Sequence, residues 1–333
     1  MEPANDLLQQ KQKARAQIHS AARSLQPLVR PSATITSPLR YPGGKRRLAA
    51  FIAETLSLNG LRPRLFVEPF AGGASVSLQL LKDDKVEAIA LGEKDPLVAS
   101  FWKIVFNDHK WLTRQIQRIT PSLKLWKKYK HGVMQDDHQR ALACLFLNRT
   151  SFSGILAPGA GPLGGWQQAS AYTIDCRYNK EQLIRNIKAV AELSDKVLFV
   201  QEGSWRQTIA RCERRSWPRG EVFYYLDPPF YEKAEKLYRF SFRDQDHAAL
   251  RDYLTQLQQN WLLSYDPAPY ILALYAEQTN GTKRVNLLYS ASKNDEIRPT
   301  QELIVTSINS LPEPERLWRS AAEWKGAAAV SGA

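Results

Sequence analysis

Apolar runs that end in a turn and lead into an amphipathic segment recur along the chain. The stretch "RLFVEPFAGGASVSLQLL" predicts a strand, a glycine-rich turn and a helix, and "VEAIALGEKDPLVASFWKIV" repeats this order with an acidic residue where the strand ends. Later strands are predicted at "KVLFVQEGSW", "EVFYYLDPPF", "NWLLSYD", "RVNLLYSAS" and "TQELIVTSI". Strands that alternate with helices predict an α/β fold, with a mostly parallel sheet, helices on both faces and a ligand at the carboxyl ends of the strands.

The alternation is interrupted between residues 108 and 195. Amphipathic helices rich in Trp, Lys and Arg occupy this interval and lead into the Gly/Pro-rich loop "SGILAPGAGPLGGW". We expect an inserted, mostly helical subdomain at 108–195, between one half of an α/β domain at 38–107 and its second half at 196–310. Residues 1–37 predict a basic, partly disordered extension, and residues 311–333 a C-terminal tail.

Composition and charge narrow the class of protein. The 333 residues are 44% hydrophobic, which is enough for a large core. Lys and Arg number 46 against 33 Asp and Glu, so the formal charge is +13. This balance favours a polyanionic partner, with nucleic acid first and an acidic membrane second.

The cysteines and the apolar segments indicate the compartment. Cys144, Cys176 and Cys212 lie far apart without a CxxC or Cys/His cluster, so neither a disulfide framework nor a metal site is expected. No segment approaches the roughly 18 uninterrupted apolar residues of a membrane span, and the start of the chain is too polar for a signal peptide. We therefore expect a soluble protein of the cytoplasm.

The turn after the first predicted strand, "VEPFAGGAS", is the first candidate for chemistry. It places Gly72 and Gly73 where a backbone passes close to a ligand or to the next helix, and a purely structural tight turn fits it equally well. Glu93 ends the next strand roughly 20 residues further on, where a carboxylate accepts both hydroxyls of a ribose. Together they predict a site for a nucleoside-containing cofactor, while the lack of GxGxxG argues against a nicotinamide oxidoreductase.

The motif "DPPF", residues 227–230, ends a strongly apolar strand. Pro229 has no backbone N–H and holds Pro228 out of the helical region, so the Pro228 carbonyl points outward from a rigid turn. Asp227 is a second acceptor, and Phe230 supplies a flat ring, a combination that suits the exocyclic amino group of a stacked heterocycle. Hydrogen bonds to these acceptors stabilise the positive charge that develops as the amine attacks an electrophile. A Pro-Pro turn that only ends a strand is the alternative.

Four motifs in linear order carry a resemblance to a known family. "LRYPGGK", "FVEPFAGGAS", "LNRTSFSGI" and "DPPF" resemble the Dam-like class of S-adenosylmethionine-dependent DNA adenine N6-methyltransferases, over residues 38 to 308. The resemblance implies a Rossmann-like methyltransferase sheet in which residues 38–107 bind the cofactor, the insertion at 108–195 recognises DNA, and residues 196–310 carry the catalytic motif. It also implies that "KLYRFSFRDQDHAAL" includes a loop that closes over the target base.

The family's functional positions map onto residues of this chain. The catalytic motif is Asp227, Pro228, Pro229 and Phe230. The S-adenosylmethionine site that the resemblance implies comprises Tyr41, Lys45, Glu68, Pro69, Phe70, Gly72, Glu93, Ser204, Trp205 and Asp227. Lys45 is otherwise explained as the end of a Gly-Gly turn.

Five further residues are implied in DNA binding. Arg40 stands where the family has a basic residue near a base edge, Arg149, Phe152 and Ser153 fall in the loop that enters the duplex, and Arg177 falls at a phosphate contact. Ordinary surface or salt-bridged arginines explain Arg149 and Arg177 as well, and a core position explains Phe152 as well.

Two departures from the family bear on activity and specificity. Position 230 more often carries Tyr in this group, but Phe stacks equally well, so activity is expected to be retained. After "NRTSFSG" the chain continues "ILAPGAGPLGG", without the polar and basic residues that read GATC in Dam itself. The recognition sequence is therefore not predicted.

The predicted function is methyl transfer to the N6 amino group of a flipped adenine in double-stranded DNA, with no metal. Alternatives are methylation of another conjugated amine, such as cytosine N4, an RNA adenine or a glutamine amide, and a DNA-binding relative that has lost catalysis. We expect a monomer in a bacterial or phage-infected cytoplasm, with a restriction or phage-defence system as its potential partner.

Overall fold

The computed structural model describes residues 35–41, 45–232, 234–277, 281–290, 297–313 and 317, together with their side chains except those of 287–290 and 297–300. Most of the predicted extension at 1–37 and of the predicted tail at 311–333 lies outside these residues, as do residues 42–44 of "RYPGGK".

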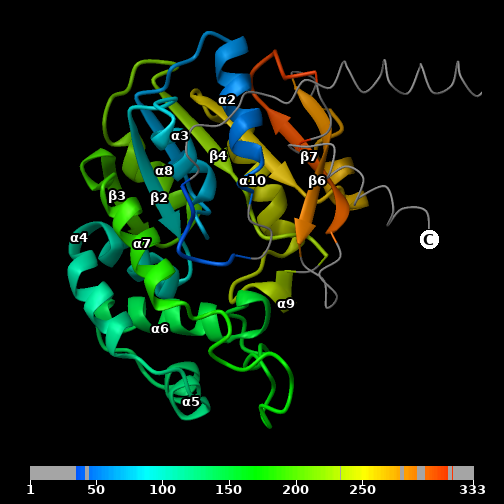
Figure 1. Cartoon of the computed structure of the whole chain (residues 1–333). Coiled ribbons are helices and arrows are strands. Elements are labelled where there is room, and N and C mark those ends of the chain that lie inside the picture. The colour runs from blue at the N-terminus through cyan, green and yellow to red at the C-terminus, as the bar shows by residue number, and fades with distance from the viewer. Residues whose placement is uncertain are drawn as a thin grey trace, which may run out of the picture.

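A seven-stranded sheet in the order β3-β2-β1-β4-β5-β7-β6 forms the centre of the molecule (Figure 1). The first five strands pair in parallel, and β7 runs antiparallel to both of its neighbours. The strands are β1 Leu65–Glu68, β2 Ala88–Glu93, β3 Val197–Glu202, β4 Val222–Leu226, β5 Asn260–Tyr265, β6 Thr282–Ser290 and β7 Ile297–Thr306. This order confirms the predicted α/β, Rossmann-like methyltransferase sheet.

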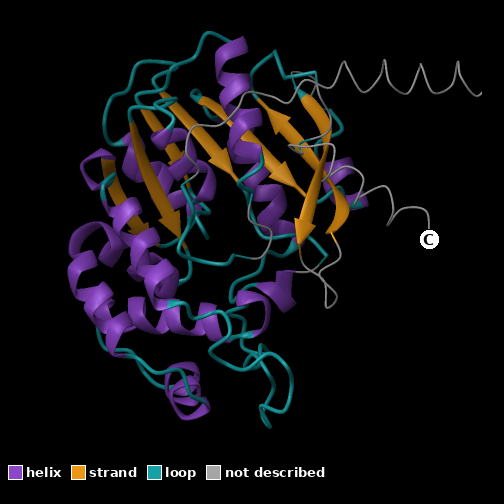
Figure 2. Ribbon diagram, in the orientation of Figure 1, coloured by secondary structure: helices purple, strands orange, loops and turns teal. Residues whose placement is uncertain are grey.

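Helices cover both faces of the sheet (Figure 2). On one face lie α2 Leu48–Leu58, α3 Ser75–Lys82, α4 Pro96–Arg118, α6 Asp137–Thr150 and α7 Lys180–Ala191, with α5 Leu123–His131 beyond them. On the other face lie α8 Trp205–Glu213, α10 Asp244–Gln256 and α11 Pro269–Leu274. Short helical turns complete the described chain: η1 Phe152–Gly154, η2 Ser194–Lys196 and α9 Ala234–Leu237.

Side chains of the central strands divide between two cores. Phe223 and Tyr225 of β4 pack into the core beneath α2 to α7, whereas Val222, Tyr224 and Leu226 pack into the core beneath α8, α10 and α11. Successive residues of a strand point to opposite faces, and a sheet covered on both sides therefore needs apolar residues at every position. This is why "VFYYL" reads as one unbroken apolar run.

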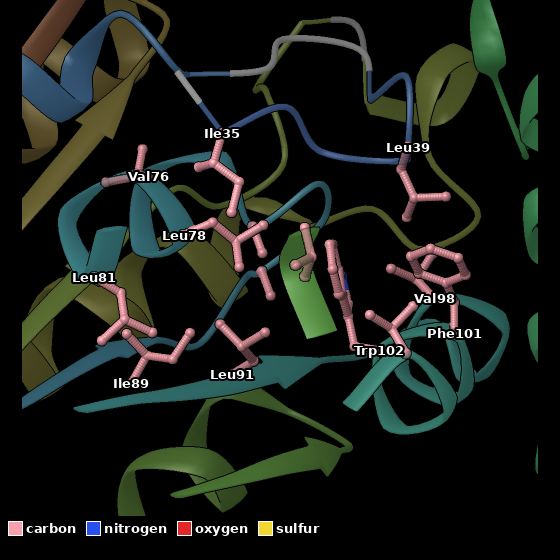
Figure 3. Close-up of a cluster of buried hydrophobic side chains, with 14 of the residues drawn as sticks. Ile35, Leu39, Val76, Leu78, Leu81, Ile89, Leu91, Val98, Phe101 and Trp102 are labelled. Carbon is pink, nitrogen blue, oxygen red and sulfur yellow. The ribbon is translucent and has the colours of Figure 1, made fainter. Parts of the chain in front are cut away.

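The larger core joins the sheet to the helices on its face. Figure 3 shows Val76, Leu78 and Leu81 of α3 packed against Ile89 and Leu91 of β2, with side chains of the first turns of α4 completing the cluster: Val98, Phe101 and Trp102. The cluster positions the amino ends of α3 and α4 next to the carboxyl ends of β1 and β2.

The predicted insertion at 108–195 contains α5, α6, α7 and a long loop between α6 and α7. Its start coincides with a break inside α4, where Asp108 leaves helical geometry with φ −148° and ψ 50°. Buried side chains of α6 and α7 belong to the same core as those of α2, α3 and α4. The interval is therefore helical, as the sequence indicates, but it shares its hydrophobic core with the sheet.

Among the helices of the described residues, none combines the length and apolar character needed to cross a membrane.

Candidate active site

A cavity of about 370 Å³ opens at the carboxyl ends of β1, β2 and β4. The strand order reverses between β1 and β4, and such a reversal is where open α/β sheets bind ligands. All of the residues that the sequence assigns to the cofactor line this cavity: Tyr41, Lys45, Glu68, Pro69, Phe70, Gly72, Glu93, Ser204, Trp205 and Asp227. The fold brings them together, and their ligand stays a prediction.

The turn after β1 is tightly constrained at Gly72. Its φ of +45° lies in the left-handed region, and a Cβ there would come within 2.7 Å of Cε1 of the Tyr41 ring. The Gly72 N–H donates to Glu93 Oε2 at 2.9 Å, and its carbonyl accepts from Trp102 Nε1 at 2.8 Å. Both conformation and space therefore require glycine here.

Two buried glutamates at strand ends face the cavity. Glu68 accepts hydrogen bonds from the N–H and hydroxyl of Ser77, and burial raises the pKa of Glu68 to about 8. Glu93 accepts from the N–H groups of Gly72 and Asp95, and burial raises its pKa to about 7 in spite of these bonds. Removing a carboxylate from water disfavours its charged form, so the cavity suits a cationic ligand.

Asp227 follows β4 and is held by two neighbours through one oxygen. Its Oδ1 lies 3.2 Å from Lys45 Nζ and accepts a hydrogen bond from Ser264 Oγ at 2.8 Å. The Ser264 hydroxyl in turn lies 2.9 Å from the Tyr225 hydroxyl. Burial raises the pKa of Asp227, while Lys45 opposes this shift. No described residue donates a hydrogen bond to Oδ2, the other carboxylate oxygen.

Lys45 links the "DPPF" motif to strand β7. Its ammonium is buried, lies 3.1 Å from Glu302 Oε1 of β7, and stands 4.6 Å from the centroid of the Phe230 ring. Glu302 was not predicted. Its partner Lys45 is 257 residues away, and nothing in the local sequence "TQELIVT" marks this strand glutamate as part of the site.

The rest of "DPPF" forms the expected open turn. Pro229 lines the cavity, and no described residue donates a hydrogen bond to the Pro228 carbonyl. The N–H of Tyr231 donates to Asp266 Oδ1 at 2.9 Å, which anchors the chain after the motif. The Phe230 ring lies edge-on to Tyr238, with centroids 6.1 Å apart.

Residues 238–242, after "DPPF", form one wall of the cavity, and none of them was individually predicted for the site. Tyr238 stacks on Tyr41 with ring centroids 5.9 Å apart, and Arg239 Nη1 pairs with Asp95 Oδ1 at 2.7 Å. Phe242 meets Phe70 edge-on at 5.7 Å. The aromatic and basic run "LYRFSF" was the available signal, but which of its side chains turn inward depends on the path of the loop.

Arg40 lies beside a turn on the rim of the site. The Asn148 side chain accepts a hydrogen bond from the Arg40 N–H and donates to the Arg40 carbonyl. It also donates to the Gly154 carbonyl, which ties Arg40 to the turn at Phe152–Gly154. Arg40 Nη1 is buried and has no hydrogen-bond partner among the described residues. Burial and then the nearby Arg177 guanidinium lower the pKa of Arg40.

The other residues implied in DNA binding divide into inward and outward groups. Phe152 is 49% exposed and is therefore not a core residue, Ser153 adopts a left-handed φ of 53°, and Arg177 is exposed. Arg149 instead turns inward, where its Nε and Nη2 donate to the Pro38 carbonyl, and burial lowers its pKa to about 10. Arg149 therefore fixes the segment that carries Arg40, and its predicted contact with DNA stays a prediction.

Comparisons with known proteins relate the chain to methyltransferases. The model of the D12 class N6 adenine-specific DNA methyltransferase family matches residues 41–291. A Type II methyltransferase, M.MjaIII of Methanocaldococcus jannaschii, is 21% identical over 251 residues, covering 66% of this chain and 80% of that protein. A solved structure from Pyrococcus horikoshii, a candidate RNA methyltransferase, matches with 10% identity and a TM-score of 0.37, over 88% of this chain and 97% of that chain.

The constraint at Gly72 predicts a specific loss of stability. Gly72→Ala places a side chain at left-handed φ and against Tyr41, and we expect it to lower the free energy of unfolding by at least about 1–2 kcal/mol. Gly159→Ala is the matched control, because nothing lies within 4 Å of its Cβ position. Denaturant unfolding of both variants measures the difference, and equal midpoints would contradict the assignment.

Proposed function

The chain belongs to the D12 class of N6 adenine-specific DNA methyltransferases, and we propose that it takes the methyl group from S-adenosylmethionine and delivers it to an adenine turned out of the duplex. Methylation of adenine in DNA was the predicted activity, and the family confirms it. The observation that carries the mechanism is a pair of acceptors at the end of β4, Asp227 Oδ2 on the cavity wall and the Pro228 carbonyl beside it, to which no described residue donates a hydrogen bond.

The charge of the cavity supports S-adenosylmethionine as the methyl donor. This molecule carries a positive sulfonium and a positive ammonium group, and the cavity holds Glu68, Glu93 and Asp227, whose pKa values are all raised by burial. A cation beside such carboxylates stabilises their charged forms. Glu93 keeps lone pairs available for a ribose although both of its oxygens accept backbone hydrogen bonds, since each carboxylate oxygen accepts more than one.

Asp227 and Pro228 would orient and activate the target amine. The two N–H groups of the adenine amine donate to Asp227 Oδ2 and to the Pro228 carbonyl, while Phe230 packs against the base. Bound S-adenosylmethionine would supply the methyl group, toward which Asp227 and Pro228 would direct the nitrogen lone pair; the electron pair of the broken carbon–sulfur bond would remain on sulfur. The acceptors stabilise the charge that develops on nitrogen, which afterwards loses one proton to Asp227 or to water.

Lys45 and Ser264 would keep the Asp227 side chain ionised, the form in which Oδ2 accepts a hydrogen bond from the substrate amine. Both bind Oδ1, which turns Oδ2 toward the substrate and opposes the rise in pKa caused by burial. The Tyr225 hydroxyl beside Ser264 Oγ directs the serine proton toward the carboxylate. The three side chains act through Asp227 and are positioning residues in this mechanism.

Arg40 and Phe152 support the entry of duplex DNA from the rim of the cavity. The Arg40 guanidinium has a buried nitrogen, Nη1, with no partner among the described residues, and turning outward would let it bind an acceptor on a base or a phosphate. Phe152 projects from a turn held by Asn148, where an apolar ring can fill the space that a flipped base leaves. Base flipping costs a few kcal/mol, which such contacts offset.

Replacement of the catalytic carboxylate tests the mechanism. We expect Asp227→Asn to reduce transfer of labelled methyl groups to duplex DNA by at least about 100-fold, because one acceptor for the developing charge is weakened. DNA binding is expected to stay at the wild-type level. Asp195→Asn, a change of the same kind at an exposed position in η2, serves as the control.

The product identifies the base and separates the alternatives. Digestion of the methylated DNA to nucleosides, followed by mass analysis, is expected to yield N6-methyladenine. A full rate in Asp227→Asn would overturn the mechanism, and N4-methylcytosine as the product would overturn the choice of base.

The raised pKa values predict that donor binding depends on pH. Glu68, with its pKa raised to about 8, and Glu93, raised to about 7, hold protons near neutral pH in the free protein. A cationic ligand favours their ionised forms, so binding releases protons and the affinity rises with pH between about 6 and 8.5, by up to about tenfold per pH unit for each proton released. Above the free-state pKa values the affinity levels off.

Titration calorimetry across that range, in buffers of different ionisation enthalpy, measures both the affinity and the protons released. Glu68→Gln removes the contribution of Glu68 and is expected to flatten the upper part of the profile. An affinity that falls with rising pH over this interval would contradict the proposed arrangement of charges.

A further inference from the structure

Helix α5, Leu123–His131, carries a row of three lysines and one histidine on one face. Lys124, Lys127, Lys128 and His131 occupy positions i, i+3, i+4 and i+7, which align along a single side of a helix. All four are exposed, and α5 contains no acidic residue. None of the four forms an ion pair with a carboxylate of the described residues. We call these four residues the α5 stripe.

The opposite face of α5 is firmly attached to the molecule. Trp126 is buried, and its Nε1 donates to Ser151 Oγ at 3.0 Å. Lys130 Nζ donates to the Ala157 carbonyl at 2.6 Å, so the helix is bonded to the loop that follows α6 at two places. Like charges at i, i+3 and i+4 destabilise a helix, and it is this packing that holds the α5 stripe in place.

The α5 stripe continues into an exposed aromatic surface. Lys127 Nζ lies 5.4 Å from the centroid of the Trp166 ring, which is 55% exposed and meets Trp126 edge-on. Ser151, which binds Trp126, immediately precedes Phe152. In Figure 1, α5 lies on the side of α6 away from the sheet, next to the loop that follows α6. Cationic and aromatic groups therefore form one surface from Phe152 to α5.

We propose that the α5 stripe, with Trp166, binds the phosphate backbone of the duplex outside the base pairs that meet the cavity, as a second DNA contact of the enzyme. This inference rests on the proposed function, because Phe152 and Arg40 mark where the duplex approaches. A helix of nine residues is about 13 Å long. Duplex DNA presents roughly eight phosphate charges over that length of its axis, which is enough to engage every member of the stripe.

The position of the α5 stripe favours duplex DNA over another polyanion. Trp126, on the opposite face of α5, is bonded to Ser151 next to Phe152, and Asn148 joins the turn at Phe152–Gly154 to Arg40, so hydrogen bonds connect α5 to the Arg40 segment. Ammonium groups bind phosphates and an exposed indole stacks on bases, and neither reads base edges, so these contacts would not depend on the DNA sequence.

Salt dependence of DNA binding tests the proposal directly. The variant Lys124→Gln/Lys127→Gln/Lys128→Gln removes three charges while keeping good helix formers. The logarithm of the binding constant is expected to fall less steeply with the logarithm of NaCl concentration, by about 2.7 for three lost phosphate contacts. The rate at saturating DNA and the binding of the methyl donor are expected to stay at wild-type levels.

Two control variants separate the effect of where the charges lie from the effect of removing charge. Arg62→Gln/Lys82→Gln/Lys85→Gln removes three exposed charges at the amino ends of the strands, across the sheet from the cavity, and is expected to leave the slope nearly unchanged. Lys124→Arg/Lys127→Arg/Lys128→Arg keeps the charge of the α5 stripe and is expected to keep the wild-type slope.

The outcomes separate this proposal from the proposed function. Equal slopes for the α5 variant and the Arg62/Lys82/Lys85 variant would overturn the second contact, whatever the catalytic result. A lowered slope in the α5 variant, with the controls unaffected, supports it even if no methyl group reaches DNA, a result that would overturn only the proposed function. Loss of binding to vesicles of acidic lipid in the α5 variant, with DNA binding intact, would assign the surface to a membrane and overturn the proposal.

Discussion

Burial of carboxylates at the carboxyl edge of a parallel sheet is the constraint on which the rest of this structure depends. Glu68, Glu93 and Asp227 each follow an apolar strand and end in one cavity, where desolvation raises the pKa of all three. The protein offsets this cost locally. Glu68 binds Ser77, Glu93 holds the backbone of the Gly72 turn, and Asp227 binds Lys45 and Ser264. A cationic ligand would stabilise the charged forms of these carboxylates, which is consistent with the proposed methyl donor.

Lys45 connects the parts of the chain that build this cavity. Its ammonium lies between Asp227 after β4 and Glu302 on β7, above the Phe230 ring. Breaking a buried ion pair leaves the remaining charges unsatisfied, so the three positions depend strongly on one another. Tyr41 and Tyr238 stack beside them, and the pair of Arg239 and Asp95 holds the covering segment against the start of α4. The geometry of the candidate site therefore depends on several segments that lie far apart in the chain.

The proposed DNA-binding side of the molecule is organised around one buried amide, that of Asn148. Asn148 on α6 holds the backbone of Arg40 and the carbonyl of Gly154, and Arg149, the next residue, holds Pro38. The Arg40 segment, the turn with the exposed Phe152 and helix α5 are thereby linked by hydrogen bonds. Lys124, Lys127 and Lys128 on α5 contribute part of the positive charge that indicated a polyanionic partner.

Periodicity predicts the α/β class and helices within 108–195, because a strand buried on both faces must be apolar throughout. The resemblance carried by the four motifs identifies the family, and the residues that it implies for the cofactor meet at one cavity because parallel strands bring their carboxyl ends to one edge. Only the tertiary structure decided that Arg149 turns inward to Pro38, that Glu302 meets Lys45, and that Tyr238 and Arg239 close the cavity. Those contacts join residues far apart in the chain, and a side chain's direction in a loop follows from what packs against it, which no local pattern records.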